Sequence, residues 1–316
     1  MADDERTPAE NPAVADDDPF VVRRAKLDAL RAAGTQPYLD HWNVTARADE
    51  LTARYAELAE GLRWGRRALD RRRYRSADHV IAISRATAAE LDHFLGLGSE
   101  RVSVVSSGID GSRWTSDAHA EDREHLASRG LEGRRFVVCV GDADWRKNSE
   151  GMFRALGLAR ESEATLQLLW VGKLSEERSR WVRAQAASLG VAGACRFLGY
   201  VPDAALKAIY RAALATLFVS RAEGFGYPVL EAMASGCPVI TSNVSSLPEV
   251  AGDAALLVDP EDSHAIAQAM LHLCREPRRR HELKRRGLVR ARAFSLESQA
   301  RETLAVYRRV LEGHST

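Results

Sequence analysis

Six short apolar runs, separated by segments of helical character, constrain the fold of this chain more than any other feature. Each run is continuously apolar rather than alternating, which is typical of parallel strands covered by helices on both faces. The runs span residues 136–140, 166–171, 195–198, 215–219, 238–241 and 255–258. We therefore predict an α/β fold with a doubly wound, Rossmann-like parallel sheet. Helices are predicted at 262–275, 278–293 and 295–312.

Two further apolar runs, at 79–84 and 102–106, are predicted as strands with a helix at 87–95 between them. The 316 residues are enough for two ordinary domains, and 45% of them are apolar, which is enough for hydrophobic cores. The formal net charge of +1 gives no general attraction for nucleic acid. Composition therefore does not favour nucleic-acid binding.

The four cysteines have neither metal-ligand spacing nor the pattern of a secreted disulfide framework. They are Cys139, Cys195, Cys237 and Cys274, and we predict reduced core cysteines in a cytoplasmic protein. No signal peptide opens the chain and no apolar run approaches about 18 residues, so we expect no membrane span. The nine histidines form no local ligand cluster. We expect neither a metal site nor a cofactor.

The sequence EGFGYPVLE at 223–231 predicts the end of a strand, a loop with two glycines and the start of a helix. The N–H groups around Gly226 and Tyr227 have no acceptor within the helix, and the helix dipole adds partial positive charge there. A phosphate would be stabilised at such a position. Gly224 and Gly226 also let the backbone approach a ligand closely.

A carboxylate lies on either side of this loop. Glu223 follows a predicted strand, at the edge where open α/β sheets bind ligands. Glu231 lies one to two turns into the helix and can accept two hydroxyl hydrogen bonds, as from a ribose diol. The segment thus fits a nucleotide sugar. The alternative is a solvated pair of glutamates around an ordinary strand–helix turn, because motifs this short also match by chance.

A second loop at the same sheet edge carries two adjacent cations. Arg146 and Lys147 follow the strand that ends at Gly141 and precede a helix that begins at Ser149. Arg146 offers a planar fork and Lys147 a compact cation, and together they suit a diphosphate. Two solvated loop cations are the alternative, but the glutamate-containing loop at the same edge favours phosphate binding.

The segment EGFGYPVLEAMASGCPVITS, with its Glu-x7-Glu spacing, resembles the donor-site signature of family four of the retaining GT-B glycosyltransferases. The resemblance covers about residues 62–312. It implies transfer of a sugar from a nucleotide diphosphate to an acceptor with retention of configuration. Glu223 would be the catalytic residue that binds the donor sugar and orients its anomeric carbon, and Glu231 would hold the ribose. The substrate-binding residues that the resemblance implies are Arg146, Lys147, Gly224, Phe225, Gly226, Tyr227 and Glu231.

Three shorter segments carry the same resemblance. WRKN at 145–148 is similar to the family's phosphate-binding segment, most of all to that of members with GDP-mannose-type donors. Residues 199–202 match the loop whose backbone contacts the base, and 245–249 resemble another loop near the donor, for which a simple helix cap is the alternative. Many members carry arginine directly after the strand-ending glycine, where this chain has Asp142. Arg146 would then substitute for that arginine.

The region before residue 61 has a different character. Residues 1–18 are acidic and rich in proline and alanine, and we predict a disordered tail. Residues 19–60 predict two helices. Their pattern RRxKLxxLRxxGxxPY resembles the extreme N-terminus of bacterial lysyl-tRNA synthetases, with a generic basic helical hairpin as the alternative. Residues 62–75 are strongly basic and are interpreted as a solvated helix face. Weak contact with an anionic membrane, peripheral to its inner face, or with nucleic acid is the alternative.

These predictions divide the chain into five parts. The first two are a tail at 1–18 and the synthetase-like segment at 19–60. The other three are a remnant of the GT-B N-terminal lobe with its hinge at 61–112, a donor-binding domain at 113–294 and a return helix at 295–316. The acceptor half of the N-terminal lobe is truncated relative to the family. Three hypotheses follow: a glycosyltransferase active alone or with a partner or oligomer that supplies the acceptor lobe, a nucleotide-sugar-binding remnant without turnover, and an interaction module. The acceptor is not identified, and a glycan and a lipid-linked sugar are both compatible.

Overall fold

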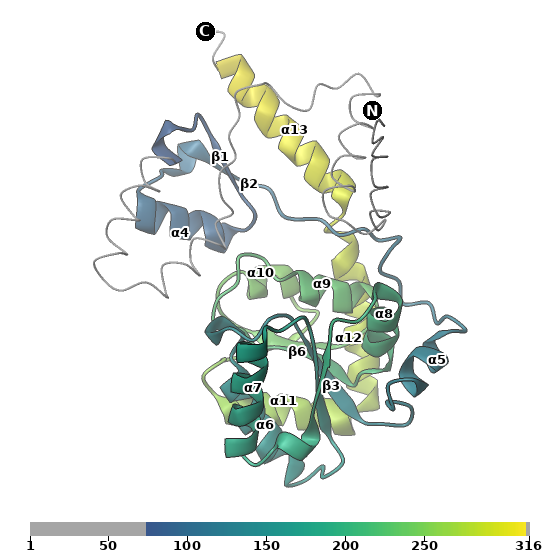
Figure 1. Ribbon diagram of the computed structural model, residues 1–316. Helices are drawn as coiled ribbons and strands as arrows, with labels where there is room; N and C mark the ends of the chain where they lie inside the picture. Colours follow the sequence, from purple (N-terminus) through teal and green to yellow (C-terminus); the bar gives the residue numbers. More distant parts are fainter. Residues whose placement is uncertain (1–73, 314–316) are drawn as a thin grey trace, which may run out of the picture. The chain divides into compact units, whose positions relative to one another are not determined.

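The computed structural model describes residues 74–313, which lie within one compact unit of the chain. A six-stranded parallel sheet has the order β5-β4-β3-β6-β7-β8. Figure 1 labels its two central strands, β3 and β6. Its strands are β3 (Phe136–Val140), β4 (Gln167–Val171), β5 (Cys195–Gly199), β6 (Ala215–Phe218), β7 (Val239–Ser242) and β8 (Leu256–Val258). Each strand overlaps one of the six apolar runs. The order extends from β3 in both directions, which confirms the doubly wound α/β fold.

Helices precede, separate and follow the strands of this sheet along the chain. They are α5 (Asp122–Ala127), α6 (Ser149–Arg160), α7 (Glu176–Ser188), α8 (Asp203–Ala212), α9 (Tyr227–Ala234), α10 (Leu247–Ala251), α11 (Ser263–Arg275), α12 (Pro277–Arg292) and α13 (Leu296–Gly313). The last three agree closely with the helices predicted at the end of the chain.

Apolar side chains divide into two buried clusters, one on each face of the sheet. Val138 contributes to the cluster that includes α8 and α9, whereas its neighbours Val137 and Cys139 contribute to the cluster that includes α6, α7 and α11. Successive residues of a strand point to opposite faces, so both faces need apolar side chains. This explains why the strands are continuously apolar.

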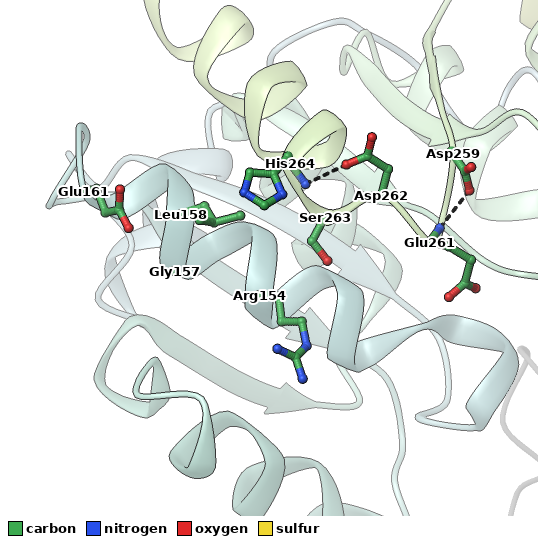
Figure 2. A pocket seen from close by; sticks show the side chains of 9 residues that line it. All are labelled: Arg154, Gly157, Leu158, Glu161, Asp259, Glu261, Asp262, Ser263 and His264. Atoms are coloured by element: carbon green, nitrogen blue, oxygen red, sulfur yellow. Dashed lines mark hydrogen bonds between the residues drawn. The ribbon is translucent and has the colours of Figure 1, made fainter.

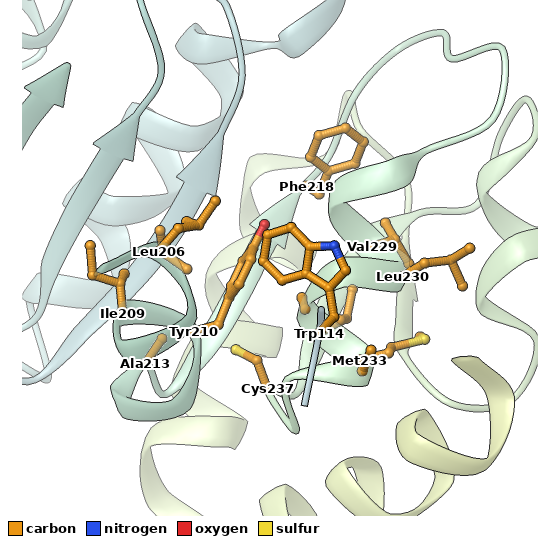
Figure 3. Close-up of a cluster of buried hydrophobic side chains, with 14 of the residues drawn as sticks. Trp114, Leu206, Ile209, Tyr210, Ala213, Phe218, Val229, Leu230, Met233 and Cys237 are labelled. Atoms are coloured by element: carbon orange, nitrogen blue, oxygen red, sulfur yellow. The ribbon is translucent and has the colours of Figure 1, made fainter. Parts of the chain in front are cut away.

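The first cluster includes side chains of α8 and of α9 (Figure 3). Trp114 and Tyr210 meet there edge to face, with their ring centroids 6.0 Å apart. Phe218 of β6 and Met233 of α9 belong to the same cluster. This packing holds α9, and with it the segment that precedes α9, against β6 and β7.

A separate two-stranded parallel sheet consists of β1 (Val80–Ala82) and β2 (Val102–Val104), with α4 (Arg85–Leu95) between them in the chain. Helix α4 begins two residues earlier, and β1 ends two residues earlier, than the sequence predicted. The cause is Ser84, whose hydroxyl accepts a hydrogen bond from the Thr87 amide and so caps the helix.

The segment after β2 contacts the junction of α12 and α13. The Ile109 amide donates to the Phe294 carbonyl at 2.8 Å, and the Gly108 amide donates to Gln299 Oε1 at 3.0 Å. A Cβ atom at Gly108 would lie 2.4 Å from the Ser295 carbonyl oxygen, so a side chain does not fit there without a shift. The start of α13 is therefore bound to the segment between β2 and α5.

Cys139, Cys237 and Cys274 are buried, Cys195 is half-buried, and all four are free thiols. No helix among residues 74–313 is long and apolar enough to cross a membrane. The predictions for the acidic tail, the synthetase-like segment and the basic run as far as residue 73 lie outside the described residues.

Candidate active site

The site lies where the strand order reverses. Strands β3 and β6 are neighbours, but the chain leaves β3 toward β4 on one side and leaves β6 toward β7 on the other. A crevice forms outside the carboxyl ends of the strands at such a switch point, and open α/β sheets bind ligands there. The loop after β3 carries Arg146 and Lys147, and the loop after β6 carries Glu223. The two predicted loops thus flank one switch point.

Lys147 and Glu223 form an ion pair across these loops. Lys147 Nζ lies 2.7 Å from Glu223 Oε1, and each side chain is only 14% exposed. The ammonium also lies over the Phe218 ring, 4.5 Å from its centroid. Gly141 has a φ of 138°, and a Cβ atom there would lie 3.3 Å from Lys147 Cε. A glycine at the end of β3 therefore leaves room for the lysine side chain.

Arg146 has a different partner. Its guanidinium binds the Asp144 carboxylate at 2.7 Å, and the Asp144 side chain also caps the short 3-10 helix Trp145–Lys147. Burial alone would raise the pKa of Asp144, but hydrogen bonds and charge from Arg146 hold that pKa below its usual value. Asp142, which directly follows Gly141, pairs with Arg178 of α7 at 3.1 Å. Of the two predicted cations, Lys147 is the one that meets a predicted glutamate.

Asn148 is a structural residue that sequence reasoning missed. It is buried in the left-handed conformation with a φ of 56°, and its side-chain oxygen caps α6. Its amide nitrogen donates to the Val219 carbonyl at 3.2 Å and to the Pro260 carbonyl at 2.6 Å. One side chain thus joins the loops after β3, β6 and β8. The signal for it was an asparagine directly before a helix start.

The backbone of Glu223 is fixed by two serines of the loop after β7. The Glu223 amide donates to Ser245 Oγ at 3.0 Å, and the hydroxyls of Ser245 and Ser246 both donate to the Glu223 carbonyl. The Ser246 hydroxyl also donates to the Phe225 carbonyl. Residues 245–249 were expected either to lie near the donor or simply to cap a helix. Neither serine hydroxyl makes a cap hydrogen bond to α10. Their described contacts hold the loop after β6 instead.

The predicted loop 223–231 leads into α9 as expected. Gly226 has a φ of 108° and occupies the position before the first helical residue, Tyr227. A side chain at Gly226 would also meet Leu247, since a Cβ atom would lie 2.7 Å from Leu247 Cδ2. Tyr227 is 41% exposed, whereas Phe225 is 3% exposed and packs against Phe294. Phe225 is therefore a core side chain, and its predicted contact with a substrate stays a prediction.

Contacts from α4 reach this loop. The Thr87 hydroxyl donates to the Gly224 carbonyl at 3.1 Å. The Arg85 amide donates to both carboxylate oxygens of Glu249, at 2.9 and 3.1 Å. The first turn of α4 is thus bound to the two loops that surround Glu223.

Glu231 lies on α9 beside the buried Tyr210, whose hydroxyl is 3.5 Å from Glu231 Oε2. Burial raises the pKa of Glu231 to about 7, and the nearby Asp203 carboxylate adds to the rise. Arg113 opposes the rise but is itself ion-paired with Asp203. A carboxylate with such a pKa is more often found at a functional site than on an ordinary surface.

A hollow of about 680 Å³ lies elsewhere, beside α6 and the start of α11 (Figure 2). Its lining residues are Arg154, Gly157, Leu158, Glu161, Asp259, Glu261, Asp262, Ser263 and His264. None of the predicted site residues is among them. Arg154 pairs with Glu150 of the same helix at 2.7 Å, and Asp262 caps α11. The hollow is therefore distinct from the switch point.

Family models match most of this chain. The model for glycosyl transferases group 1 matches residues 121–290, more than half of the chain, and the model for glycosyltransferase family 4 matches residues 40–113. The chain is 32% identical over 235 residues to the O-antigen chain mannosyltransferase B of Escherichia coli, covering 74% of this chain and 61% of that protein. It is also 32% identical over 245 residues to a D-inositol 3-phosphate glycosyltransferase of Thermobifida fusca, covering 74% and 56%. The chain thus spans less than two thirds of the length of these relatives.

Among solved structures, sucrose-phosphate synthase from Thermosynechococcus elongatus superposes with a TM-score of 0.71 and 25% identity, covering 83% of this chain and 66% of that chain. The Anabaena protein HepE, solved in complex with UDP and glucose, superposes with a TM-score of 0.67 and 19% identity, covering 74% and 64%, and shows the shared fold. A resemblance to lysyl-tRNA synthetase is not shown by these matches, and the family 4 match begins within that segment. The chain belongs to the glycosyl transferases of group 1 and has the GT-B architecture of glycosyltransferase family 4.

Proposed function

We propose that this chain binds a nucleotide diphosphate sugar at the β3–β6 switch point and transfers the sugar to an acceptor with retention of configuration. The observation that carries the proposal is the Lys147–Glu223 contact at the carboxyl ends of two central strands, directly before the N-terminus of α9. A cation and a helix N-terminus favour a diphosphate, and a carboxylate favours sugar hydroxyls.

Each residue then has a chemical role. Lys147 and the amides at the start of α9 stabilise the negative charge that develops on the departing diphosphate. Glu223 accepts hydrogen bonds from the donor sugar and orients its anomeric carbon. Glu231 accepts hydrogen bonds from the ribose hydroxyls. Arg146 contributes to phosphate binding through the Asp144-bound loop that it helps to shape.

The donor is proposed to be of the GDP-mannose type. The WRKN segment resembles that of members with such donors, and a relative at 32% identity is named an O-antigen chain mannosyltransferase. HepE, whose fold is similar, is solved with UDP, so the fold alone does not select the nucleotide. The acceptor is proposed to be a glycan or a lipid-linked sugar. We also propose that a partner or a second copy of the chain completes the acceptor side.

Donor binding is tested by thermal unfolding with GDP-mannose, UDP-glucose, ADP-glucose and dTDP-glucose. A donor at about 100 times its dissociation constant should add about 2.7 kcal/mol to the free energy of unfolding. We expect this stabilisation from GDP-mannose and expect Glu231→Ala to lose it. The absence of a shift with all four donors, in a folded sample, would contradict the proposal.

Glu223→Gln is expected to lower turnover by about a hundredfold or more, because an amide cannot stabilise the positive charge that develops at the sugar. Release of nucleoside diphosphate in the presence of glycan and lipid-linked acceptors measures this. Equal turnover of Glu223→Gln and wild type would remove the catalytic role from Glu223.

A second candidate is nucleotide-sugar binding without transfer, because the described chain before residue 113 forms a sheet of two strands. Donor stabilisation without release of nucleoside diphosphate from the wild type would favour this candidate. The third hypothesis, an interaction module, is favoured only if no nucleotide sugar binds.

A further inference from the structure

Lys147 has a buried charge and one anionic partner among the described residues. Its ammonium contacts Glu223 Oε1 at 2.7 Å and the Phe218 ring at 4.5 Å, and both charged side chains are 14% exposed. A charge with so little access to water is strongly destabilising unless an opposite charge or hydrogen-bonding groups compensate it. Whatever displaces Glu223 from Lys147 must therefore bring its own negative charge.

The two backbones are fixed while the two side chains can exchange partners. Lys147 is followed by the buried Asn148, which binds three loops together, and the Glu223 backbone is held by Ser245 and Ser246. Both side chains are long and reach the contact through several rotatable bonds. Gly141 adds space beside the lysine stem. Separation of the pair therefore needs rotamer changes only.

Arg146 does not substitute for Lys147 in this exchange. Its guanidinium is bound by Asp144, the residue that also caps the same short helix. Lys147 is thus the cation whose partner belongs to the opposite loop. A diphosphate at this edge would meet Lys147 and Glu223 together, and it would attract the first and repel the second.

We propose that Glu223 is the exchangeable counter-ion of Lys147, so that a diphosphate displaces the Glu223 carboxylate from the lysine. This inference rests on the proposed function. A nucleotide sugar satisfies both partners, since its phosphate pairs with Lys147 and its sugar hydroxyls donate to the freed Glu223. A nucleoside diphosphate has no sugar and leaves Glu223 without hydrogen-bond donors. Glu223 then competes for Lys147 and favours release of the product.

The test is a double-mutant cycle measured by calorimetric titration with GDP, UDP, ADP and dTDP. The four proteins are wild type, Glu223→Gln, Lys147→Gln and the double variant. We expect Glu223→Gln to bind the preferred nucleoside diphosphate about tenfold more tightly than wild type, and Lys147→Gln to bind it about tenfold more weakly. In the Lys147→Gln background, the gain from the Glu223 substitution should be clearly smaller than about tenfold, because only the direct repulsion between the carboxylate and the diphosphate is then relieved.

The cycle separates an exchange from a general effect of charge. An equal gain in affinity with and without Lys147 would mean that Glu223 merely repels the diphosphate, and this would overturn the proposal. Unchanged or weaker binding by Glu223→Gln would also overturn it, while leaving the donor site intact. If none of the four nucleotides binds wild type or Glu223→Gln, the proposed function fails as well. Glu223→Ala, with unfolding curves for every variant, guards against misfolding of a single variant.

Discussion

Replacing Asn148 by alanine is expected to lower the free energy of unfolding by about 4 kcal/mol. The substitution removes the hydrogen bonds to the carbonyls of Val219 and Pro260, which lie in the loops after β6 and β8. A buried polar group left without a partner is destabilising by about 1–3 kcal/mol. Loss of the side-chain cap on α6 adds about 1 kcal/mol, and alanine in the left-handed conformation adds about 1 more. The free energy of unfolding of a folded domain is only about 5–15 kcal/mol in total, so this loss is a large fraction of it.

Unfolding in urea measures this loss of stability. The comparison requires that the slope of the free energy of unfolding against urea concentration is the same in the variant as in wild type. Asn148→Gly is the matched control, because glycine tolerates a φ of 56° but also lacks the side chain. The free energy of unfolding of Asn148→Gly should exceed that of Asn148→Ala by about 1 kcal/mol and no more. A total loss below about 1 kcal/mol in Asn148→Ala would mean that the three loops are held by other contacts. Because Asn148 directly follows Lys147, we also expect weaker nucleotide binding in both variants.

The sheet and its order of elements could be predicted because they depend on local patterns. Continuous apolar runs separated by helical segments require parallel strands covered on two faces, and β3 was predicted with its observed bounds. Errors at the ends of elements came from side chains that cap helices. Ser84 ends β1 early because its hydroxyl accepts a hydrogen bond from the Thr87 amide and caps α4.

The ion pairs of Arg146 and Lys147 were not among the predictions made from the sequence. Arg146 binds Asp144, two residues before it, and Lys147 reaches Glu223, 76 residues away. The expectation that both cations bind a diphosphate stays a prediction. The first contact could have been inferred, since a short aspartate side chain commonly binds the backbone two residues on. The second could not, because it depends on the spatial neighbourhood of β3 and β6. The burial of Phe225 against Phe294 could not be inferred from the sequence either, because it also depends on which segments lie side by side in the fold.

Glu231→Gln is expected to make the protein more stable above pH 7 and to flatten its dependence on pH. The pKa of Glu231 is raised from 4.5 to about 7, so the folded state holds a proton that the unfolded state has lost. Stability contributed by this group is fully present below pH 4.5, falls as the pH rises, and is lost above pH 7. A shift of this size corresponds to about 3 kcal/mol. Glutamine can still accept a hydrogen bond from Tyr210 but does not ionise.

The difference in the free energy of unfolding between Glu231→Gln and wild type should therefore grow by about 3 kcal/mol from pH 4.5 to pH 8. Glu261→Gln is the control with the opposite sign, since hydrogen bonds from Arg221 lower the pKa of Glu261 and its contribution is present above pH 4.5. Parallel curves for Glu231→Gln and wild type would show that Glu231 ionises normally. A carboxylate that destabilises the free protein when ionised is stabilised by a ligand that donates two hydroxyl hydrogen bonds to it. Donor binding should therefore lower the pKa of Glu231, and the stabilisation by donor should be greater at pH 8 than at pH 6.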